Sequence, residues 1–196
     1  MDWHAVVGVA AGLIQLYSIV PYIKGMIHGE VRPNIVSWAL WAIIQFVVIG
    51  AQIATGISWA ILIPAALAFN TILVLILCFR GYGYTRYGWL DAVCFMLVVL
   101  AIVLWQTTNN ALFALALSII ADFLAGVPTY LKVYKLPYSE STSAWVLLVV
   151  ANILALVSIS TWTWGNSSYS LYGVLISVIF IPVMIMRRRI VRPRTS

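Results

Sequence analysis

Charged residues are scarce in this sequence, and their scarcity excludes an ordinary water-soluble domain. Asp, Glu, Lys and Arg make up 8% of the 196 residues, whereas they account for about a quarter of a typical globular domain. Hydrophobic residues make up 64% of the chain. A soluble domain of this size cannot bury so much apolar surface, so the composition predicts an all-α integral membrane protein.

Cysteine and histidine are also rare, which argues against metal sites and catalytic sites. The two cysteines, Cys78 and Cys94, lack the spacing of metal ligands, and we expect no structural disulfide between them. The two histidines, His4 and His28, flank apolar segments. The sequence also lacks a phosphate-binding loop. We therefore expect no metal, no cofactor and no enzymatic activity.

The net charge of +6 does not indicate a nucleic-acid partner. Most basic residues are scattered singly between apolar runs, and no basic stripe forms. The only cluster follows the last apolar run and consists of Arg187, Arg188, Arg189, Arg192 and Arg194. The partners we expect are the lipid bilayer and a small solute.

The apolar runs predict seven membrane-spanning helices. A bilayer core of about 30 Å requires roughly 20 helical residues. On that measure the spans fall near residues 4–24, 35–55, 57–79, 88–105, 110–132, 143–163 and 168–187.

Lysine and arginine lie on one side of this seven-span arrangement. The eleven residues occupy the loops after the first, third and fifth spans and the C-terminal tail: Lys24, Arg32, Arg80, Arg86, Lys132, Lys135 and the five arginines of the tail. Positive charge favours the cytoplasmic side. The sequence therefore predicts an outside N-terminus and a cytoplasmic C-terminus, in what we take to be a bacterial inner membrane. An inner aromatic belt would then contain Trp38, Trp41, Trp89 and Trp145.

An internal repeat relates the first three spans to the last three. Positions 107 residues apart match at the pairs Pro21 and Pro128, Trp38 and Trp145, and Arg80 and Arg187. We interpret residues 1–81 as the first three-helix repeat, 82–109 as a linker helix, 110–187 as the second repeat and 188–196 as a basic cytoplasmic tail. A single linker helix makes the two halves parallel, in a 3+1+3 arrangement about an axis along the membrane normal.

Six of the predicted spans carry a polar residue close to their centre. These residues are Gln15, Gln45, Asn70, Asp122, Asn152 and Ser177, and the 107-residue offset pairs them. Polar groups at the bilayer midplane are costly when exposed to lipid, so they are expected to face inward and to mark a site. We predict a central cavity that binds solute through the five uncharged residues. The alternative is that they only join helices, at about 0.6 kcal/mol per contact.

These features resemble the PQ-loop and SWEET transporter superfamily over nearly the whole chain. A proline occurs in the first helix of each half, as Pro21-Tyr22 and Pro128-Thr129, although the glutamine of the family motif is absent from both. The surrounding stretches are similar to an uncharacterised bacterial seven-span branch. The resemblance implies a carrier in which two three-helix bundles rock to give alternating access. It also matches Asn70 to a solute-binding asparagine of SWEET proteins, with Ser177 at the equivalent position of the second half.

The two prolines are predicted to form hinges. A proline inside a helix removes one backbone hydrogen bond and crowds the carbonyl four residues before it. Pro21 and Pro128 would therefore kink both halves at equal depth, although a static kink is the alternative. Trp38 lies seven residues before Gln45, about 10 Å toward the cytoplasm at 1.5 Å per residue. We therefore interpret Trp38 and Trp145 as cytoplasmic gate residues.

Asp122 is the only ionisable residue at the centre of a predicted span. Asp2, Glu30 and Glu140 fall in the aqueous flanks, and Asp91 lies near the end of the fourth span. A buried carboxyl group can be neutral near pH 7 and ionise when water reaches it. Asp122-Phe123, six residues before Pro128, resembles proton-coupled PQ-loop transporters, which implies a proton-carrying role. The alternative is a structural acid bonded to Asn152 or another amide.

Several functions remain compatible with the sequence. The leading one is a carrier for a small polar solute (a sugar, an amino acid or a vitamin) with or without proton coupling. A second is a vitamin carrier of the nicotinamide riboside type, which has the same 3+1+3 plan. A third is a non-transporting receptor or sensor of the same fold, because fold alone does not define function. The sequence leaves open whether the chain forms a homo-oligomer.

Overall fold

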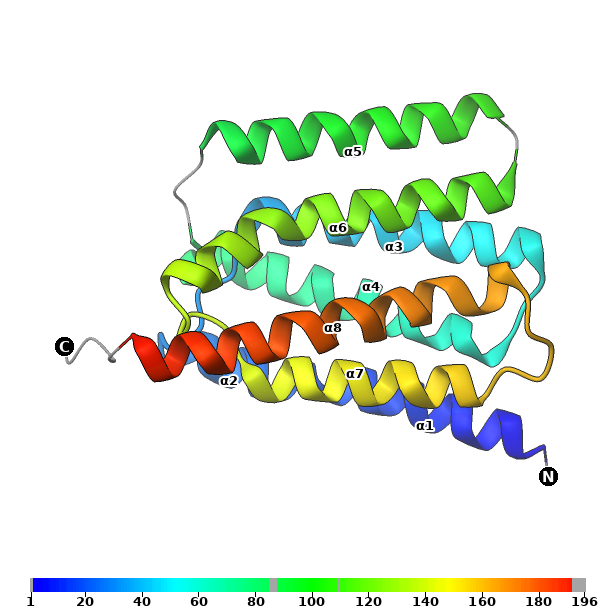
Figure 1. Cartoon of the computed structure of the whole chain (residues 1–196), viewed down its shortest axis with the longest axis horizontal. Helices are drawn as coiled ribbons and strands as arrows, with labels where there is room; N and C mark the ends of the chain where they lie inside the picture. The colour runs from blue at the N-terminus through cyan, green and yellow to red at the C-terminus, as the bar shows by residue number, and fades with distance from the viewer. Residues whose placement is uncertain (1, 85–87, 109, 192–196) are drawn as a thin grey trace.

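The computed structural model describes residues 2–84, 88–108 and 110–191, and no β-strand occurs among them. This confirms the prediction of an all-helical chain. The helices are α1 (Trp3–Tyr17), α2 (Ile19–Ile27), α3 (Ile35–Thr55), η1 (Trp59–Ile61), α4 (Leu62–Leu77), η2 (Cys78–Tyr82), α5 (Trp89–Thr108), α6 (Ala111–Lys135), α7 (Thr142–Val157) and α8 (Trp164–Ile190) (Figure 1). Arg86, Arg192, Arg194 and the side chain of Cys94 lie outside the described part of the chain.

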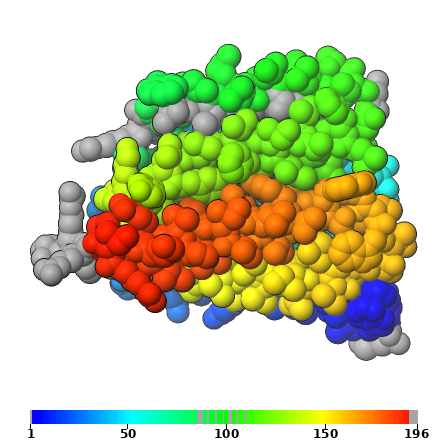
Figure 2. Space-filling view, viewed as in Figure 1, coloured from blue at the N-terminus to red at the C-terminus, as the bar shows by residue number. Residues whose placement is uncertain are grey.

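Five helical segments within the described residues are long and apolar enough to cross a bilayer. They are Trp3–Ile27, Ile35–Thr55, Trp59–Tyr82, Ala111–Lys135 and Trp164–Ile190. The helices lie lengthwise beside one another, with the start of α1 and the end of α8 at opposite ends of the bundle (Figure 1). On the face shown in Figure 2, α5, α6, α8 and α7 form neighbouring rows. These features are compatible with a membrane protein.

Side-chain caps determine where most of the long helices begin. The Asn34 Oδ1 atom accepts a hydrogen bond from the Ser37 amide at 3.1 Å, and α3 begins at the next residue. The Ser141 Oγ atom does the same for the Ala144 amide at 3.3 Å, before α7. Such caps satisfy backbone N–H groups that have no partner inside the helix.

The helix α7 is shorter than the sixth predicted span. We expected a helix over residues 143–163, but α7 ends at Val157. The Ser158 hydroxyl donates to the Ala155 carbonyl at 2.7 Å, and Thr163 adopts an extended conformation to cap α8. Hydroxyl side chains that bond nearby backbone groups compete with helix continuation, and a run of them ends α7 early.

The polar and apolar residues are distributed inside out relative to a soluble protein. Gln45, Asn70, Asp122 and Asn152 are all buried, whereas the adjacent Phe46, Phe69, Phe123 and Ile153 are exposed. In water this arrangement would leave large apolar side chains solvated and polar groups enclosed. In lipid the same arrangement is favourable, because the outer surface is apolar and the polar groups face one another.

Helix contacts in the two halves of the chain follow the same pattern. In the first half α4 packs against both α1 and α3, and in the second half α8 packs against both α6 and α7. The halves meet through α1 with α7 and through α3 with α6, while α5 packs mainly on α6. These contacts leave the inner faces of both halves directed toward the same central region.

Candidate functional site

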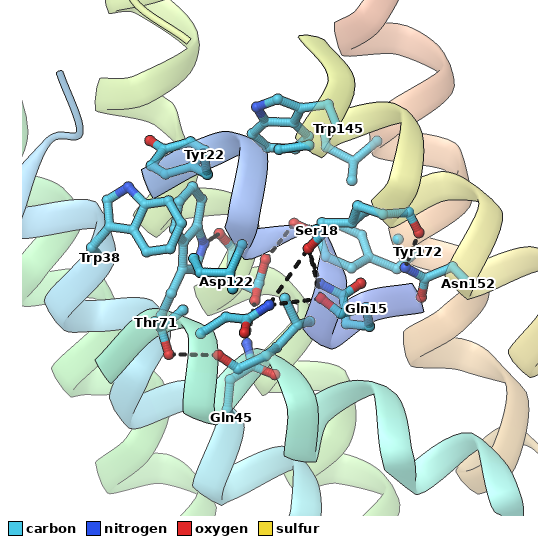
Figure 3. A pocket seen from close by; sticks show the side chains of 18 of the residues that line it. Gln15, Ser18, Tyr22, Trp38, Gln45, Thr71, Asp122, Trp145, Asn152 and Tyr172 are labelled. Atoms are coloured by element: carbon cyan, nitrogen blue, oxygen red, sulfur yellow. Dashed lines mark hydrogen bonds between the residues drawn. The ribbon is translucent and has the colours of Figure 1, made fainter. Parts of the chain in front are cut away.

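A cavity lies between the two halves and is lined by residues of α1, α2, α3, α4, α6, α7 and α8. It contains about 800 Å³ of space between atoms, including its opening. Two sets of its polar side chains are distinguished below by their hydrogen bonds, and Figure 3 labels members of both. We call Asp122, Gln45, Tyr169 and Tyr172 the acid side, and Gln15, Ser18, Asn70 and Asn152 the amide side.

The acid side is a hydrogen-bonded network around one carboxyl group. The hydroxyl of Tyr172 lies 2.9 Å from Asp122 Oδ2, and the hydroxyl of Tyr169 lies 2.9 Å from Asp122 Oδ1. Gln45 Nε2 lies 3.4 Å from Oδ1 and 2.8 Å from the Tyr169 oxygen. The indole N–H of Trp41 donates to the backbone carbonyl of Asp122 at 3.0 Å. Both carboxyl oxygens therefore accept hydrogen bonds from neutral donors.

The amide side connects the end of α1 to α4. Asn70 Nδ2 donates to the backbone carbonyl of Gln15 at 2.7 Å. The Ser18 hydroxyl donates to the same carbonyl at 2.7 Å, and Gln15 Nε2 lies 3.2 Å from Ser18 Oγ. Ser18 stands at the break between α1 and α2. These side chains bond the Gln15 carbonyl oxygen just before the interruption at Ser18, which stabilises the break.

Asn152 completes the amide side from α7. Its Nδ2 atom donates to the Leu148 carbonyl of its own helix at 2.9 Å. Its side chain lies against Gly173 of α8, where an added Cβ would come within 2.6 Å of Asn152 Oδ1. Gly173 therefore provides the room that the Asn152 amide occupies beside the cavity.

Of the six residues in the predicted polar layer, five line this cavity. The exception is Ser177, which is fully buried and whose hydroxyl donates to the Gly173 carbonyl at 2.7 Å. The other five are Gln15, Gln45, Asn70, Asp122 and Asn152. A serine inside a helix often bonds the carbonyl four residues earlier, and Ser177 does so instead of facing the cavity.

The predicted hinge and gate residues occupy different places. Trp38 and Trp145 line the cavity, and Figure 3 shows them with Tyr22 at the end opposite Gln45. Pro21 lies in α2, just after the break at Ser18, and Pro128 lies within the continuous helix α6. The first helix of each half therefore carries its proline near the cavity, but only the first half has an interruption in its helix.

Three aromatic residues that bond Asp122 were not among the predicted ones. Tyr169 and Tyr172 were missed because the repeat pairs them with Leu62 and Ala65, so they have no polar counterpart. Their spacing of three residues places both on one face of a helix, which is a signal that could have found them. Trp41 was assigned to an interfacial belt, but it is buried against Asp122.

Glu140 is buried, and the prediction that it lies in an aqueous flank is wrong. Its carboxylate is 2.7 Å from the Lys132 ammonium, and both side chains are almost fully enclosed. Lys132 also donates to the Arg32 carbonyl in the loop before α3, and the Arg32 amide donates to the Ser139 carbonyl. A buried charge requires a partner, and these contacts join the two halves at one end of the bundle.

The fold and the cavity together describe an all-helical protein, with several helices suited to a membrane and a central cavity whose lining includes polar side chains. No family model, curated protein or solved structure matches the chain.

Proposed function

We propose that this protein is a seven-span membrane carrier for a small polar solute, with an outside N-terminus and a cytoplasmic C-terminus. In this proposal two three-helix bundles, joined by α5, rock about the central cavity to expose it alternately to each side. The observation that carries the proposal is the cavity itself, because both halves contribute its polar lining.

The helix contacts support a two-fold repeat. A two-fold axis that exchanges the halves converts the contact between α1 and α7 into the contact between α6 and α3, and both contacts are present. The caps Asn34 and Ser141 stand 107 positions apart, as do the first residues of α3 and α7. Parallel repeats of this kind place a solute site at their interface.

The position of the basic residues supports the orientation. Basic side chains occupy the last turns of α2, η2, α6 and α8: Lys24, Arg80, Lys132, Lys135, Arg187, Arg188 and Arg189. The ends of α2, α6 and α8 lie at the same end of the bundle (Figure 1). The positive-inside tendency would place that end in the cytoplasm.

Closure at the cytoplasmic end is attributed to two layers. The first is aromatic: the Trp38 ring packs against the tilted ring of Tyr22 at a centroid distance of 4.9 Å in the first half, and Trp145 packs on Phe180 at 4.5 Å in the second. The second is the set of contacts from Lys132 to Glu140 and to the Arg32 carbonyl. In the proposed cycle these layers separate when the cavity opens to the cytoplasm.

The acid side also supports proton coupling at Asp122. The Tyr169 hydroxyl lies 2.9 Å from Asp122 Oδ1 and 3.0 Å from Gln45 Oε1, so it can donate to either oxygen. With Asp122 ionised, Tyr169 donates to the carboxylate. With Asp122 protonated, the carboxyl donates to Tyr169, which then donates to Gln45. The Asp122 carboxyl group therefore keeps a hydrogen-bond partner in either protonation state, as a proton carrier requires.

Two-sided access to the cavity tests the proposal. Cys78 and Cys94 are first replaced by serine, and Thr71→Cys then places one thiol in the cavity lining. A membrane-impermeant thiol reagent should modify this cysteine when added to either side of oriented vesicles. The matched control is Phe69→Cys on the same helix, which faces outward and should react from neither side because lipid covers it.

A receptor or sensor would behave differently in this measurement. Its cavity would open to one side only, so Thr71→Cys would react from that side alone under every condition. Labelling restricted to one side, with or without added solutes, would contradict the carrier.

A further inference from the structure

Three buried amide oxygens on the amide side accept no hydrogen bond from any residue that the structure describes. They are Gln15 Oε1, Asn70 Oδ1 and Asn152 Oδ1. All three side chains line the cavity and are 1–3% exposed. Buried acceptors without partners are rare and costly in native proteins, so a partner for these oxygens is expected from within the cavity.

The orientation of the three amides is determined by their other contacts. Asn70 Nδ2 and Asn152 Nδ2 each face a backbone carbonyl, which can only accept. Gln15 Nε2 faces the Ser18 oxygen, whose own hydrogen is directed to the Gln15 carbonyl. Turning any amide around would bring two acceptors together. The oxygens, and not the nitrogens, are therefore the free atoms.

The three amides also come from helices that pack against one another. Gln15 lies on α1, Asn70 on α4 and Asn152 on α7, and each of these helices contacts the other two. A ligand group with several N–H donors can bond more than one of these oxygens at once. A protonated primary amine has three such donors and no acceptor.

The charge of the lining favours a cation. Among the residues that line the cavity in the described structure, Asp122 is an acid and none is lysine, arginine or histidine. An anionic ligand would find no compensating charge there, whereas a cation would neutralise the carboxylate. The walls also carry the rings of Trp38, Trp41 and Trp145, whose faces attract cations.

We propose that the cavity binds a small organic cation carrying a protonated primary amine. The ammonium group donates to the free oxygens of the amide side, and the carboxylate of the acid side supplies the opposite charge. This proposal rests on the carrier function proposed above, and names the chemical class of its solute.

Matched sets of small molecules test this assignment by ligand-induced thermal stabilisation of the purified full-length protein. Each set has one carbon skeleton of two to six carbons bearing an ammonium, a hydroxyl or a carboxylate group, for example ethanolamine, ethylene glycol and glycolate, or glucosamine, glucose and glucuronate. Hydrogen bonds to charged groups are stronger than neutral ones, so the best ammonium compound should half-saturate the protein at a concentration at least about tenfold below its hydroxyl partner.

Variants separate the two sides of the cavity. Asp122→Asn should abolish the preference for the ammonium compound over its hydroxyl partner. Asn152→Ala should weaken binding of the ammonium compound several-fold, because it removes one of the free oxygens. The variant should still fold, since the one hydrogen bond of the Asn152 side chain lies within its own helix. The matched control is Gln52→Ala, a buried amide of α3 that also lacks partners among the described residues but does not line the cavity. It should leave binding unchanged.

The results distinguish this inference from the carrier proposal. If hydroxyl or carboxylate members stabilise the wild-type protein as well as their ammonium partners do, or if no ammonium member stabilises it, the assigned solute class is wrong. Uptake of the best-binding compound into proteoliposomes is measured separately. Binding without uptake would contradict the carrier but keep the ligand class, whereas uptake of the neutral member alone would keep the carrier and overturn the ligand class.

Discussion

The two sides of the cavity occupy equivalent positions in the proposed repeat, but their polar atoms are used differently. The offset of 107 residues relates Gln15 to Asp122 and Gln45 to Asn152. On the acid side, Asp122 and Gln45 bond to each other and to tyrosines. On the amide side, the oxygens of Gln15 and Asn152 remain without partners in the described structure. Positions that the proposed repeat pairs thus hold a hydrogen-bonded network on the acid side and free acceptor oxygens on the amide side.

Two tyrosines account for most of this difference. Tyr169 and Tyr172 supply the hydroxyl groups that satisfy Asp122, whereas Leu62 and Ala65 stand at the equivalent positions of the first half. Leucine and alanine have no donor to offer to Gln15. In the proposed two-fold repeat, the scaffold determines where polar groups lie, and the neighbouring side chains determine which of those groups are available to a ligand.

Glu140 provides the largest expected effect, because its ion pair exists in one half only. The positions equivalent to Lys132 and Glu140 are Gly25 and Pro33. Glu140→Gln should lower the free energy of unfolding by about 3 kcal/mol or more, since it leaves the buried Lys132 ammonium without its counterion. Denaturant unfolding of the purified protein measures this loss. The control Glu30→Gln, at an exposed site in the matching loop, should change stability by less than about 0.5 kcal/mol. If Glu140→Gln and Glu30→Gln lowered the free energy of unfolding equally, the ion pair would not distinguish the second half from the first.

Asp122→Asn should have the next largest effect. The variant keeps the size of the side chain but removes its negative charge, so cation affinity should fall by about tenfold or more. It should also lose uptake driven by a pH gradient, while exchange of labelled solute at equal pH persists. Proteoliposome uptake with and without an imposed gradient measures both. A variant that retains full gradient-driven accumulation would show that Asp122 is a structural acid.

Tyr169→Phe tests whether the acid side is saturated. Removing this hydroxyl takes a donor from Asp122 and a partner from Gln45, and should lower the free energy of unfolding by about 1–3 kcal/mol. The matched change on the other half, Leu62→Phe, removes no polar partner. Its effect should reflect packing alone. If Tyr169→Phe unfolds at the same denaturant concentration as the wild type, the hydrogen-bond network of the acid side contributes little to stability.

Asn152→Ala should have the smallest effect on stability and a measurable one on binding. Its single hydrogen bond is made within α7, so the free energy of unfolding should change by less than about 1 kcal/mol. Loss of one neutral hydrogen bond to the ligand should weaken binding by about threefold to tenfold. Isothermal titration and denaturant unfolding of the same preparation separate the two quantities. A binding loss no larger than the folding loss would indicate that Asn152 only joins helices.

Much of the helical arrangement could be predicted from the sequence, because apolar runs and proline positions are strong local signals. The early end of α7 could not be predicted. It depends on the Ser158 hydroxyl bonding the nearby Ala155 carbonyl, and the sequence does not show whether a serine side chain makes such a bond. The burial of Glu140 was also missed. A charged loop residue is predicted to be exposed to water unless its partner, here Lys132 on another element, is known to be close.

The site was predicted where polar residues interrupt apolar spans, since such residues are costly in lipid and are few. This criterion selected Gln15, Asn70 and Asn152, which line the cavity. It failed for Ser177, whose hydroxyl bonds the Gly173 carbonyl, because sequence spacing does not distinguish a cavity-facing serine from a self-bonded one. Which amide oxygens are free also depends on side-chain geometry that no pattern contains.

A structure of the full-length protein with the best-stabilising ammonium compound tests the central claim most directly. The account predicts that the compound lies in the cavity between the two halves. Its nitrogen should be within hydrogen-bonding distance of at least two of the oxygens of Gln15, Asn70 and Asn152. A compound bound outside this cavity, or one whose nitrogen contacts none of the three oxygens, would contradict the claim that the amide side is the ligand-binding surface.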